Sequence, residues 1–307
     1  MIHQLSGPKL YLSSIALSLL YLIGFEPFGY QFIGLLAVSA LFYFAINLNE
    51  KRAALLFFLF GFFLYCTGLY WLYISVHIVS GAPKILAILL IIILSIYLSL
   101  FHSVFGFIFV KFHRKIANEW VSLLLIAPSL WTFLEILRGY FLTGFPWFSL
   151  GYMESASLIS SWAPIGGVFL VSMMMAIASS AILLFFLNKR VLGGLIIVLL
   201  TVSSYLLGEV NWTYKSNDAP YRVALVQGNI EQDKKWLRSE FENTLTLYAN
   251  SLSGLEGTDL VIWPEVAIPS LKRNVEEYLE YLETKAIEKD IQMLILGINT
   301  QDQNGQV

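Results

Sequence analysis

The stretch from Asp259 to Glu265 has the residue types of a strand followed by a catalytic acid or base. Asp259 to Trp263 predict a buried strand, because they contain a short apolar run rich in β-branched and aromatic side chains. Pro264 cannot donate a hydrogen bond to a sheet, so we expect it to end the strand. Glu265 would then follow the strand's carboxyl end, where open α/β sheets place their ligands. A partly desolvated carboxylate there could accept a proton; the alternative is an ordinary surface glutamate.

The other reactive side chains show no metal-binding pattern. His77 and His102 are single imidazoles in apolar segments without a companion at metal-ligand spacing, so we expect each to face the interior of a helix bundle. Cys66 is the only cysteine, so no disulfide can form within the chain, and its apolar surroundings predict inert packing. The sequence therefore predicts no metal and no cofactor. A net charge of −2, without a basic patch, also argues against a nucleic-acid partner.

The composition is that of a membrane protein. Of the 307 residues, 57% are hydrophobic and 13% are charged, and the mean hydropathy is +0.70, which is too apolar for a soluble globular protein. The first apolar segment is followed by Glu26 and Pro27 rather than by a small-residue cleavage site, so we expect a retained span and not a signal peptide. Residues 1–208 are predicted to form a polytopic α-helical membrane bundle of about seven spans. The predicted spans are residues 9–25, 31–47, 54–77, 84–110, 120–137, 163–187 and 191–208.

Basic residues in the loops predict a cytoplasmic amino terminus. The positive-inside rule assigns the side with more Lys and Arg to the cytoplasm. One side carries eight such residues, namely Lys9, Lys51, Arg52, Lys111, Arg114, Lys115, Lys189 and Arg190. The other side carries only Lys84, Arg138 and Lys215. Seven spans then place everything after residue 208 outside, which in a bacterium is the periplasm.

One predicted outer loop, from Arg138 to Phe148, is rich in aromatic residues and glycine. It is either an aromatic belt at the membrane interface or a lipid-contacting surface beside an active site, and its glycines and Pro146 favour a shaped loop. Glu135 and Arg138 are three residues apart and could pair on one helix face. Because they lie at the end of a predicted span, we expect them instead to extend toward the interface as anchors.

Residues 209–220 form a polar linker, and residues 221–307 have the pattern of a soluble α/β domain. The order is strand, helix, strand, helix, strand, which predicts a parallel sheet with crossover helices. The strands are expected at residues 221–227, 259–263 and 291–297, and the helices carry apolar stripes over residues 237–252 and 275–286. The elements predicted beside these three parallel strands are too few to cover both faces of a sheet, so this domain is expected to be incomplete.

Several stretches together resemble one family, the apolipoprotein N-acyltransferases of bacterial membranes. They follow in order over nearly the whole chain, and their combination with seven spans makes the set specific. The stretches are Gly68-Leu69-Tyr70-Trp71-Leu72-Tyr73, Leu142-Thr143-Gly144-Phe145-Pro146-Trp147, Val226-Gln227-Gly228-Asn229-Ile230, Lys235-Trp236 and Ile262-Trp263-Pro264-Glu265-Val266-Ala267-Ile268-Pro269.

The resemblance implies a bundle joined to the first part of a periplasmic nitrilase-like (carbon–nitrogen hydrolase) domain with an αββα fold. It implies an inner-membrane enzyme that moves an acyl chain from a phospholipid to the amino-terminal diacylglyceryl-cysteine of an apolipoprotein, the final step of lipoprotein maturation. The route is an acyl-thioester formed on a Glu-Lys-Cys triad. Glu265 would match the proton acceptor, and Trp236 a tryptophan near the lipid entrance. Phe145 and Trp147 fit a surface that meets the phospholipid.

The family's lysine and cysteine are expected beyond Val307, so the chain would be an incomplete copy and inactive by itself. Lys272, Lys285 and Lys289 precede the third strand, which is not where the triad lysine belongs, and Cys66 lies in a span. Two alternatives stay open. One is a membrane-tethered amidohydrolase that releases its acyl group to water, and the other is a non-enzymatic scaffold or remnant.

We predict that the protein isolated from its native membrane has an intact mass above the 34.8 kDa of these residues. The reason is that thioester chemistry needs a thiol that the chain does not supply at a matching position. Mass spectrometry of the purified protein measures this directly. A mass of 34.8 kDa would instead favour an inactive remnant or a half-enzyme that depends on a partner.

Overall fold

The computed structural model of the chain contains two compact units, unit 1 (Met1–Tyr214) and unit 2 (Lys215–Val307). It describes residues 7–153, 157–214 and 220–301. Within the predicted linker, residues 215–219 lie outside the described residues, and Lys215 of the orientation argument is one of them.

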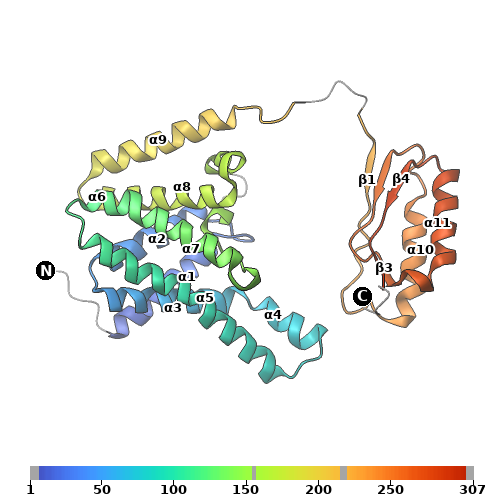
Figure 1. Ribbon diagram of the computed structural model, residues 1–307, viewed down its shortest axis with the longest axis horizontal. Coiled ribbons are helices and arrows are strands. Elements are labelled where there is room, and N and C mark those ends of the chain that lie inside the picture. The colour runs from blue at the N-terminus through green and yellow to red at the C-terminus, as the bar shows by residue number, and fades with distance from the viewer. Residues whose placement is uncertain (1–6, 154–156, 215–219, 302–307) are drawn as a thin grey trace. The chain divides into compact units, whose positions relative to one another are not determined.

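Unit 1 is built from apolar helices, since segments rich in Leu, Ile, Phe and Ala favour a structure whose backbone hydrogen bonds are internal. The long helices are α1 (Gly7–Ile23), α2 (Gln31–Ile46), α3 (Glu50–Gly68), α5 (Lys84–His113), α7 (Ala127–Tyr140), α8 (Ala163–Phe186) and α9 (Arg190–Gly208) (Figure 1). Two short helices continue as π-helices, α4 (Trp71–Tyr73) to Val79 and α6 (Glu119–Val121) to Ile126. Three 3₁₀ turns lie at Phe141–Thr143, Leu150–Met153 and Leu158–Trp162.

Within the described residues, five helical stretches are long and apolar enough to cross a membrane. They are Glu50–Gly68, Lys84–His113, Glu119–Thr143, Leu158–Phe186 and Arg190–Gly208. Helices α1 and α2, with 17 and 16 residues, are shorter apolar helices. All seven predicted segments are thus helical, and five reach the length of a span. The third helix ends at Gly68, not near residue 77 as predicted, because glycine disfavours helix and the chain continues as α4.

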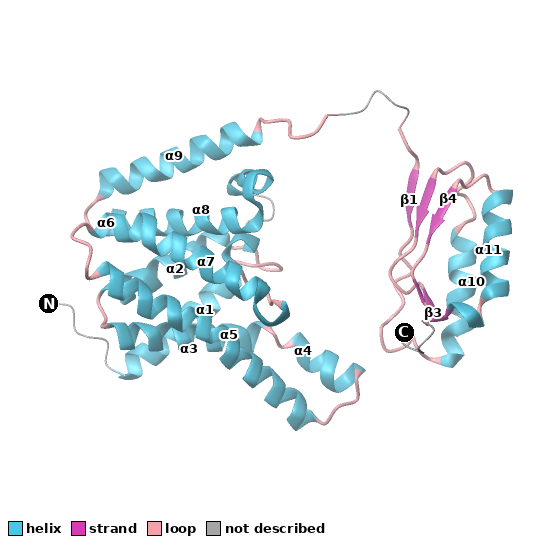
Figure 2. Cartoon of the chain, in the orientation of Figure 1, coloured by secondary structure: helices cyan, strands magenta, loops and turns pink. Residues whose placement is uncertain are grey.

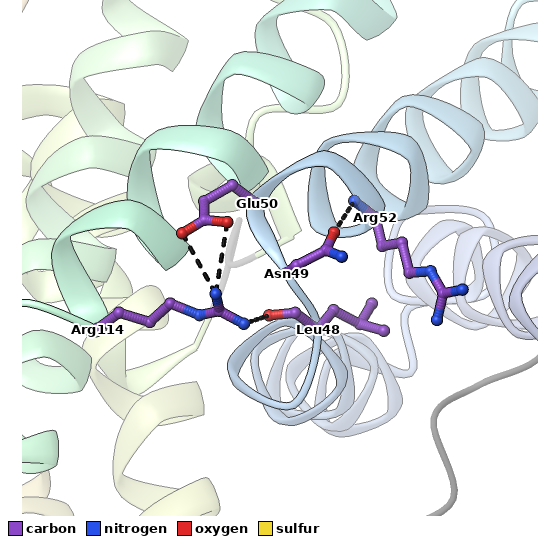
Figure 3. Close-up of polar contacts among 5 residues, drawn as sticks. All are labelled: Leu48, Asn49, Glu50, Arg52 and Arg114. Carbon is purple, nitrogen blue, oxygen red and sulfur yellow. Dashed lines mark hydrogen bonds and ion pairs between the residues drawn. The ribbon is translucent and has the colours of Figure 1, made fainter.

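Side chains at one end of unit 1 fix where α3 begins and α5 ends (Figure 3). The Asn49 side chain caps α3 by accepting a hydrogen bond from the Arg52 backbone N–H at 2.9 Å. Arg114, just after α5, donates to the Leu48 carbonyl at 3.0 Å and lies 3.4 Å from the Glu50 carboxylate. These contacts hold the carboxyl end of α5 against the amino end of α3.

The core of unit 1 depends on close packing of α3 against α5. Phe57 of α3 meets Phe105 of α5 edge to face, with ring centroids 4.9 Å apart, and both rings are buried. Gly106 lets the helix backbones approach, since a Cβ there would lie 2.6 Å from the Phe57 ring and 2.7 Å from the Ala53 carbonyl oxygen. The outer faces of α5 and α9 are apolar and exposed, as expected for surfaces that meet lipid.

Unit 2 has a three-stranded parallel sheet in the order β1-β2-β4, formed by Val223–Leu225, Leu260–Ile262 and Met293–Ile295. Its helices are α10 (Phe241–Ser251) and α11 (Glu276–Glu288), so the predicted order of elements and the parallel pairing are confirmed. A second parallel pair, β3 (Ile268–Leu271) with β5 (Ile298–Asn299), was not predicted, because both strands are short and β3 contains Pro269.

Figure 2 shows both helices of unit 2 on the same side of the β1-β2-β4 sheet. The side toward the helices includes Val261, which is fully buried, and Tyr278 of α11 donates a hydrogen bond to the Leu245 carbonyl of α10 at 2.7 Å. Burial raises the pKa of the Tyr278 hydroxyl, so it stays a neutral donor. Four apolar side chains of the outer strands are exposed, namely Val223, Leu225, Met293 and Ile295.

We predict that Gly106→Ala lowers the stability of unit 1 by about 1–3 kcal/mol, because the added methyl overpacks the contact between α3 and α5. The measurement is thermal unfolding of the purified protein in detergent, followed by circular dichroism. Gly194→Ala in α9 is the matched control: a Cβ there meets nothing within 4 Å. It is expected to leave stability unchanged or raise it by roughly 0.5–1 kcal/mol. Equal melting of the two variants would contradict the packing argument.

Candidate functional site in two units

Glu265 lies in a turn directly after β2, as predicted, but its side chain is exposed. The preceding Trp263 is 3% exposed and packs against Tyr248, with ring centroids 4.9 Å apart. Val266 has a φ of +50°, and a Cβ on Gly297 would lie 2.5 Å from its backbone nitrogen. The expectation of a partly desolvated carboxylate is therefore wrong for this unit: tight packing of the turn's backbone directs the carboxylate outward while Trp263 occupies the core.

The segment that contains Trp236 lies next to this turn. Lys235 donates from Nζ to the backbone carbonyl of Glu265 at 3.4 Å. The following Trp236 is 55% exposed, and it lines an open groove of unit 2. The residues lining this groove are Lys235, Trp236, Leu237, Arg238, Phe241, Glu242, Pro269, Ser270 and Asn274. The fold thus brings two predicted site residues, 29 positions apart in sequence, to one region.

The aromatic loop of unit 1 holds the other two predicted site residues. Phe145 and Trp147 stack, with ring centroids 4.8 Å apart and planes at 28°. Trp71, at the start of α4, lies against Trp147 with centroids 6.0 Å apart. We call these three residues the aromatic platform. Sequence reasoning named Trp71 in a family motif but not as a site residue, although its place in an aromatic run shortly before a Gly-Ala-Pro turn was a usable signal.

Glu135 and Arg138 are buried, with exposures of 5% and 1%, so the expectation that they extend to the interface is wrong. Within the described part of the chain they do not form an ion pair with each other either, which was the alternative. Arg138 donates to the carbonyl oxygens of Phe145 and Trp147 and to the Ser149 hydroxyl. Glu135 accepts from the Trp131 indole and the Leu150 backbone N–H, both at 2.8 Å. The irregular loop supplies partners that a regular helix end lacks.

The remaining candidates form no cluster. His102 is buried between Phe60, Tyr65 and Trp131, and Cys66 is half-buried in α3. In residues 7–153, 157–214 and 220–301, no group of three or more His, Cys, Asp or Glu side chains could hold a metal ion.

Comparison with known proteins identifies the family. The model of the apolipoprotein N-acyltransferase N-terminal domain matches residues 17–181, more than half of the chain. The chain belongs to the apolipoprotein N-acyltransferase family. The apolar helices of its described residues and this family identify a multi-pass membrane protein.

Three relatives, each named apolipoprotein N-acyltransferase, extend the match into unit 2. The one from Vibrio cholerae is 31% identical over 305 residues, 99% of this chain and 59% of the relative. The one from Pseudomonas syringae pv. tomato is 31% identical over 290 residues, 92% of this chain and 56% of the relative. The one from Azotobacter vinelandii is 35% identical over 287 residues, 91% of this chain and 55% of the relative. The chain thus spans little more than half the length of these curated relatives.

In this N-acyltransferase family member, we predict that Gly144→Ala disorders the aromatic loop. Gly144 has a φ of +82°, and a Cβ there would lie 1.9 Å from the Gly139 carbonyl oxygen. Chymotrypsin should therefore cleave near Phe141 faster in the variant than in the parent protein in detergent. Gly139→Ala is the control, since its Cβ would meet only Phe169 at 3.4 Å. Equal cleavage of both variants at the parent rate would refute a conformational requirement for glycine.

Proposed function

We propose that this protein transfers an acyl chain from a phospholipid to the amino-terminal diacylglyceryl-cysteine of an apolipoprotein, through an acyl-thioester. Family membership supports acyl transfer in general. The observation that carries the specific proposal is that Lys235 binds the backbone carbonyl of Glu265, which follows β2, while Lys235 and Trp236 line an open groove of unit 2. An exposed carboxylate in the same region of unit 2 as an exposed tryptophan suits proton transfer near an apolar substrate.

In the proposed reaction Glu265 accepts the proton of a cysteine thiol, and the thiolate attacks the ester carbonyl of the phospholipid. A thioester forms, a lysophospholipid leaves after Glu265 returns the proton to its oxygen, and a lysine stabilises the developing oxyanion. The amine of the apolipoprotein then attacks the thioester, and Glu265 moves a proton from the amine to the departing thiolate, so that an amide forms and the thiol is released. Cys66 is not the proposed nucleophile, because it lies in α3 of unit 1. Trp236 is the proposed contact for the acyl chain in unit 2.

We assign unit 2 to the nitrilase-like αββα architecture. Its support is a parallel sheet with both helices on one side and exposed apolar side chains on β1 and β4 (Figure 2). Parallel sheets are normally covered on both faces, and a second sheet against these side chains would provide that cover. The proposed bundle is residues 1–208, the proposed linker is residues 209–220, and residues 221–307 belong to the proposed catalytic domain.

The proposed location is the bacterial inner membrane, with the amino terminus in the cytoplasm and unit 2 in the periplasm. Five basic residues lie near the start of α3 and the end of α5, which contact each other through Arg114 and Glu50. They are Lys51, Arg52, Lys111, Arg114 and Lys115. Such a basic helix end favours the cytoplasmic side. Arg138 no longer counts on the opposite side, because it is buried.

The exposed aromatic platform supports the acyltransferase over an amidohydrolase that works in water. Trp147 is 46% exposed and Trp71 36%, and both belong to a unit whose helices are apolar on the outside. Aromatic side chains at the ends of membrane helices favour the headgroup region. A hydrolase that meets its substrate in water has no use for such a surface.

The test uses the protein at its native length in native membranes. It is given a phospholipid with a labelled acyl chain and a peptide that begins with diacylglyceryl-cysteine. We expect the label on the peptide amine. Labelled free fatty acid would identify the amidohydrolase instead, and no release of label would favour a binding protein.

Glu265→Gln should reduce formation of the labelled thioester by about 10²-fold or more, the usual effect of losing a general base. Glu283→Gln, an exposed glutamate on α11, is the matched control and should keep the parent rate. Thioester formation is measured by single-turnover labelling followed by hydroxylamine release. A parent-like rate in Glu265→Gln would remove this residue from the reaction.

A further inference from the structure

The loop that carries Phe145 and Trp147 has a backbone that is difficult to maintain. Leu142, Thr143, Gly144 and Phe148 all have positive φ values, between +50° and +82°. Three of these residues have a Cβ, and such side chains rarely adopt this conformation. Strained backbone persists only where its surroundings over-determine it, and it concentrates where proteins bind ligands. The residues around this loop must therefore hold it in this conformation.

Arg138 supplies the largest set of restraints. Its guanidinium donates from Nη1 to the carbonyl oxygens of Phe145 at 3.2 Å and Trp147 at 2.5 Å, and from Nη2 to the Ser149 hydroxyl at 2.9 Å. Its own backbone carbonyl accepts from the Phe145 N–H at 3.0 Å. The planar, permanently charged guanidinium suits this task because its donors have a fixed geometry. One side chain thus fixes the loop on both sides of Pro146.

Glu135, one turn earlier on α7, holds the end of the same loop. Its Oε1 accepts from the Leu150 N–H and from the Trp131 indole, both at 2.8 Å. The next backbone N–H, of Gly151, donates to the Ser172 hydroxyl of α8 at 2.8 Å. Burying a charged group costs free energy unless the group is paired or hydrogen-bonded. Here the Arg138 guanidinium and Glu135 Oε1 bind loop backbone, whereas Glu135 Oε2 has no hydrogen-bond partner among the described residues.

Two tyrosines complete the support from other helices. The Tyr21 hydroxyl of α1 donates to the Phe148 carbonyl at 2.9 Å. The Tyr65 ring of α3 lies 5.7 Å from the Arg138 guanidinium carbon. Side chains of α1, α3, α7 and α8 therefore support the loop and its end, while the outward side chains Phe141, Leu142 and Trp147 are 46–69% exposed.

We propose that Arg138 and Glu135 are positioning residues that fix the loop from Phe141 to Leu150, so that the aromatic platform is a rigid surface for the acyl chains of a phospholipid. Acyl chains fit because the exposed side chains are apolar and continue the apolar outer face of the membrane helices. A preformed surface binds more tightly, since less conformational entropy is lost on binding. The identity of the ligand rests on the proposed function, whereas the positioning role of Arg138 and Glu135 does not.

The loop conformation is measured first, because it does not depend on acyl transfer. A nitroxide label is attached to Leu142→Cys in a Cys66→Ser background, and its mobility is recorded by electron paramagnetic resonance in detergent. Leu142 is 69% exposed, so the label is accommodated. We expect the label to be restricted in the parent and mobile in Arg138→Met. Its mobility should be intermediate in Arg138→Lys, because lysine keeps the positive charge but lacks the planar set of donors of a guanidinium.

Arg114→Met is the matched control. Arg114 also binds a backbone carbonyl and lies near a glutamate, but it does so beside α3 and α5 rather than at the loop (Figure 3). Its variant should leave the label restricted. A restricted label in folded Arg138→Met would overturn the proposal. If Arg138→Met does not fold, Ser149→Ala decides: it removes one acceptor of Arg138, and unchanged mobility would likewise overturn the inference.

The second measurement is kinetic. In the active protein, Arg138→Lys should raise the KM for phospholipid by about tenfold with a smaller change in kcat, because a displaced binding surface weakens substrate binding. A lower kcat with an unchanged KM would overturn the assignment of the platform to lipid. Absence of acyl transfer in the parent would refute the proposed function, and the label mobility would still decide the positioning.

Discussion

The hydrogen bonds that Arg138 donates to loop backbone are the contacts on which the conformation of the loop from Phe141 to Leu150 depends. A bundle of apolar helices cannot satisfy the backbone of an irregular loop, and lipid offers no donors either. A buried guanidinium solves this because it brings several donors on one side chain. Arg138 holds the carbonyl oxygens of both Phe145 and Trp147, the two residues whose rings stack.

The two arginine–glutamate combinations of unit 1 show how environment decides the use of the same residue types. Arg114 and Glu50 are partly exposed and lie 3.4 Å apart, a geometry that contributes little to stability in water. Arg138 and Glu135 are buried, and each binds backbone and neighbouring side chains instead of the other. Two buried charged groups of this kind are a poor source of stability compared with apolar packing, and their proposed role is to specify one loop conformation. The burial of Arg138 is therefore consistent with its proposed role in holding the loop that binds the phospholipid.

Unit 2 is organised by the turn after β2. Trp263 anchors the turn in the core against Tyr248, Gly297 lets the neighbouring backbone approach, and Glu265 is directed outward. Lys235 then binds the Glu265 carbonyl and brings Trp236 to the same region. In the described part of unit 2 the only helices of more than eight residues, α10 and α11, cover the same side of the sheet, and apolar side chains remain exposed on β1 and β4. The proton transfer proposed for Glu265 would therefore take place on an exposed surface of unit 2.

Some elements follow from local sequence. Hydropathy located all seven apolar helices, because an unbroken apolar run fixes its own hydrogen bonds as a helix wherever it is placed. The alternation of strands and amphipathic helices after residue 220 predicted β1, β2 and β4 and their parallel order, since crossover helices favour parallel neighbours. By contrast, β3 and β5 escaped notice because two short strands, one with a proline, carry no periodic signal.

Local sequence is sufficient to predict the apolar helices, the β-α-β-α-β order, the place of Glu265 after β2 and the family motifs. These properties depend on residues that are neighbours in the chain. The tertiary structure alone decided that Arg138 and Glu135 are buried, that Trp71 joins Phe145 and Trp147, and that the Glu265 side chain is exposed. Burial and ring contacts depend on which distant segments pack together. Arg138 has the same neighbours in the chain whether it extends to the interface or turns inward, and only the folded loop supplies the carbonyl groups that hold it inside.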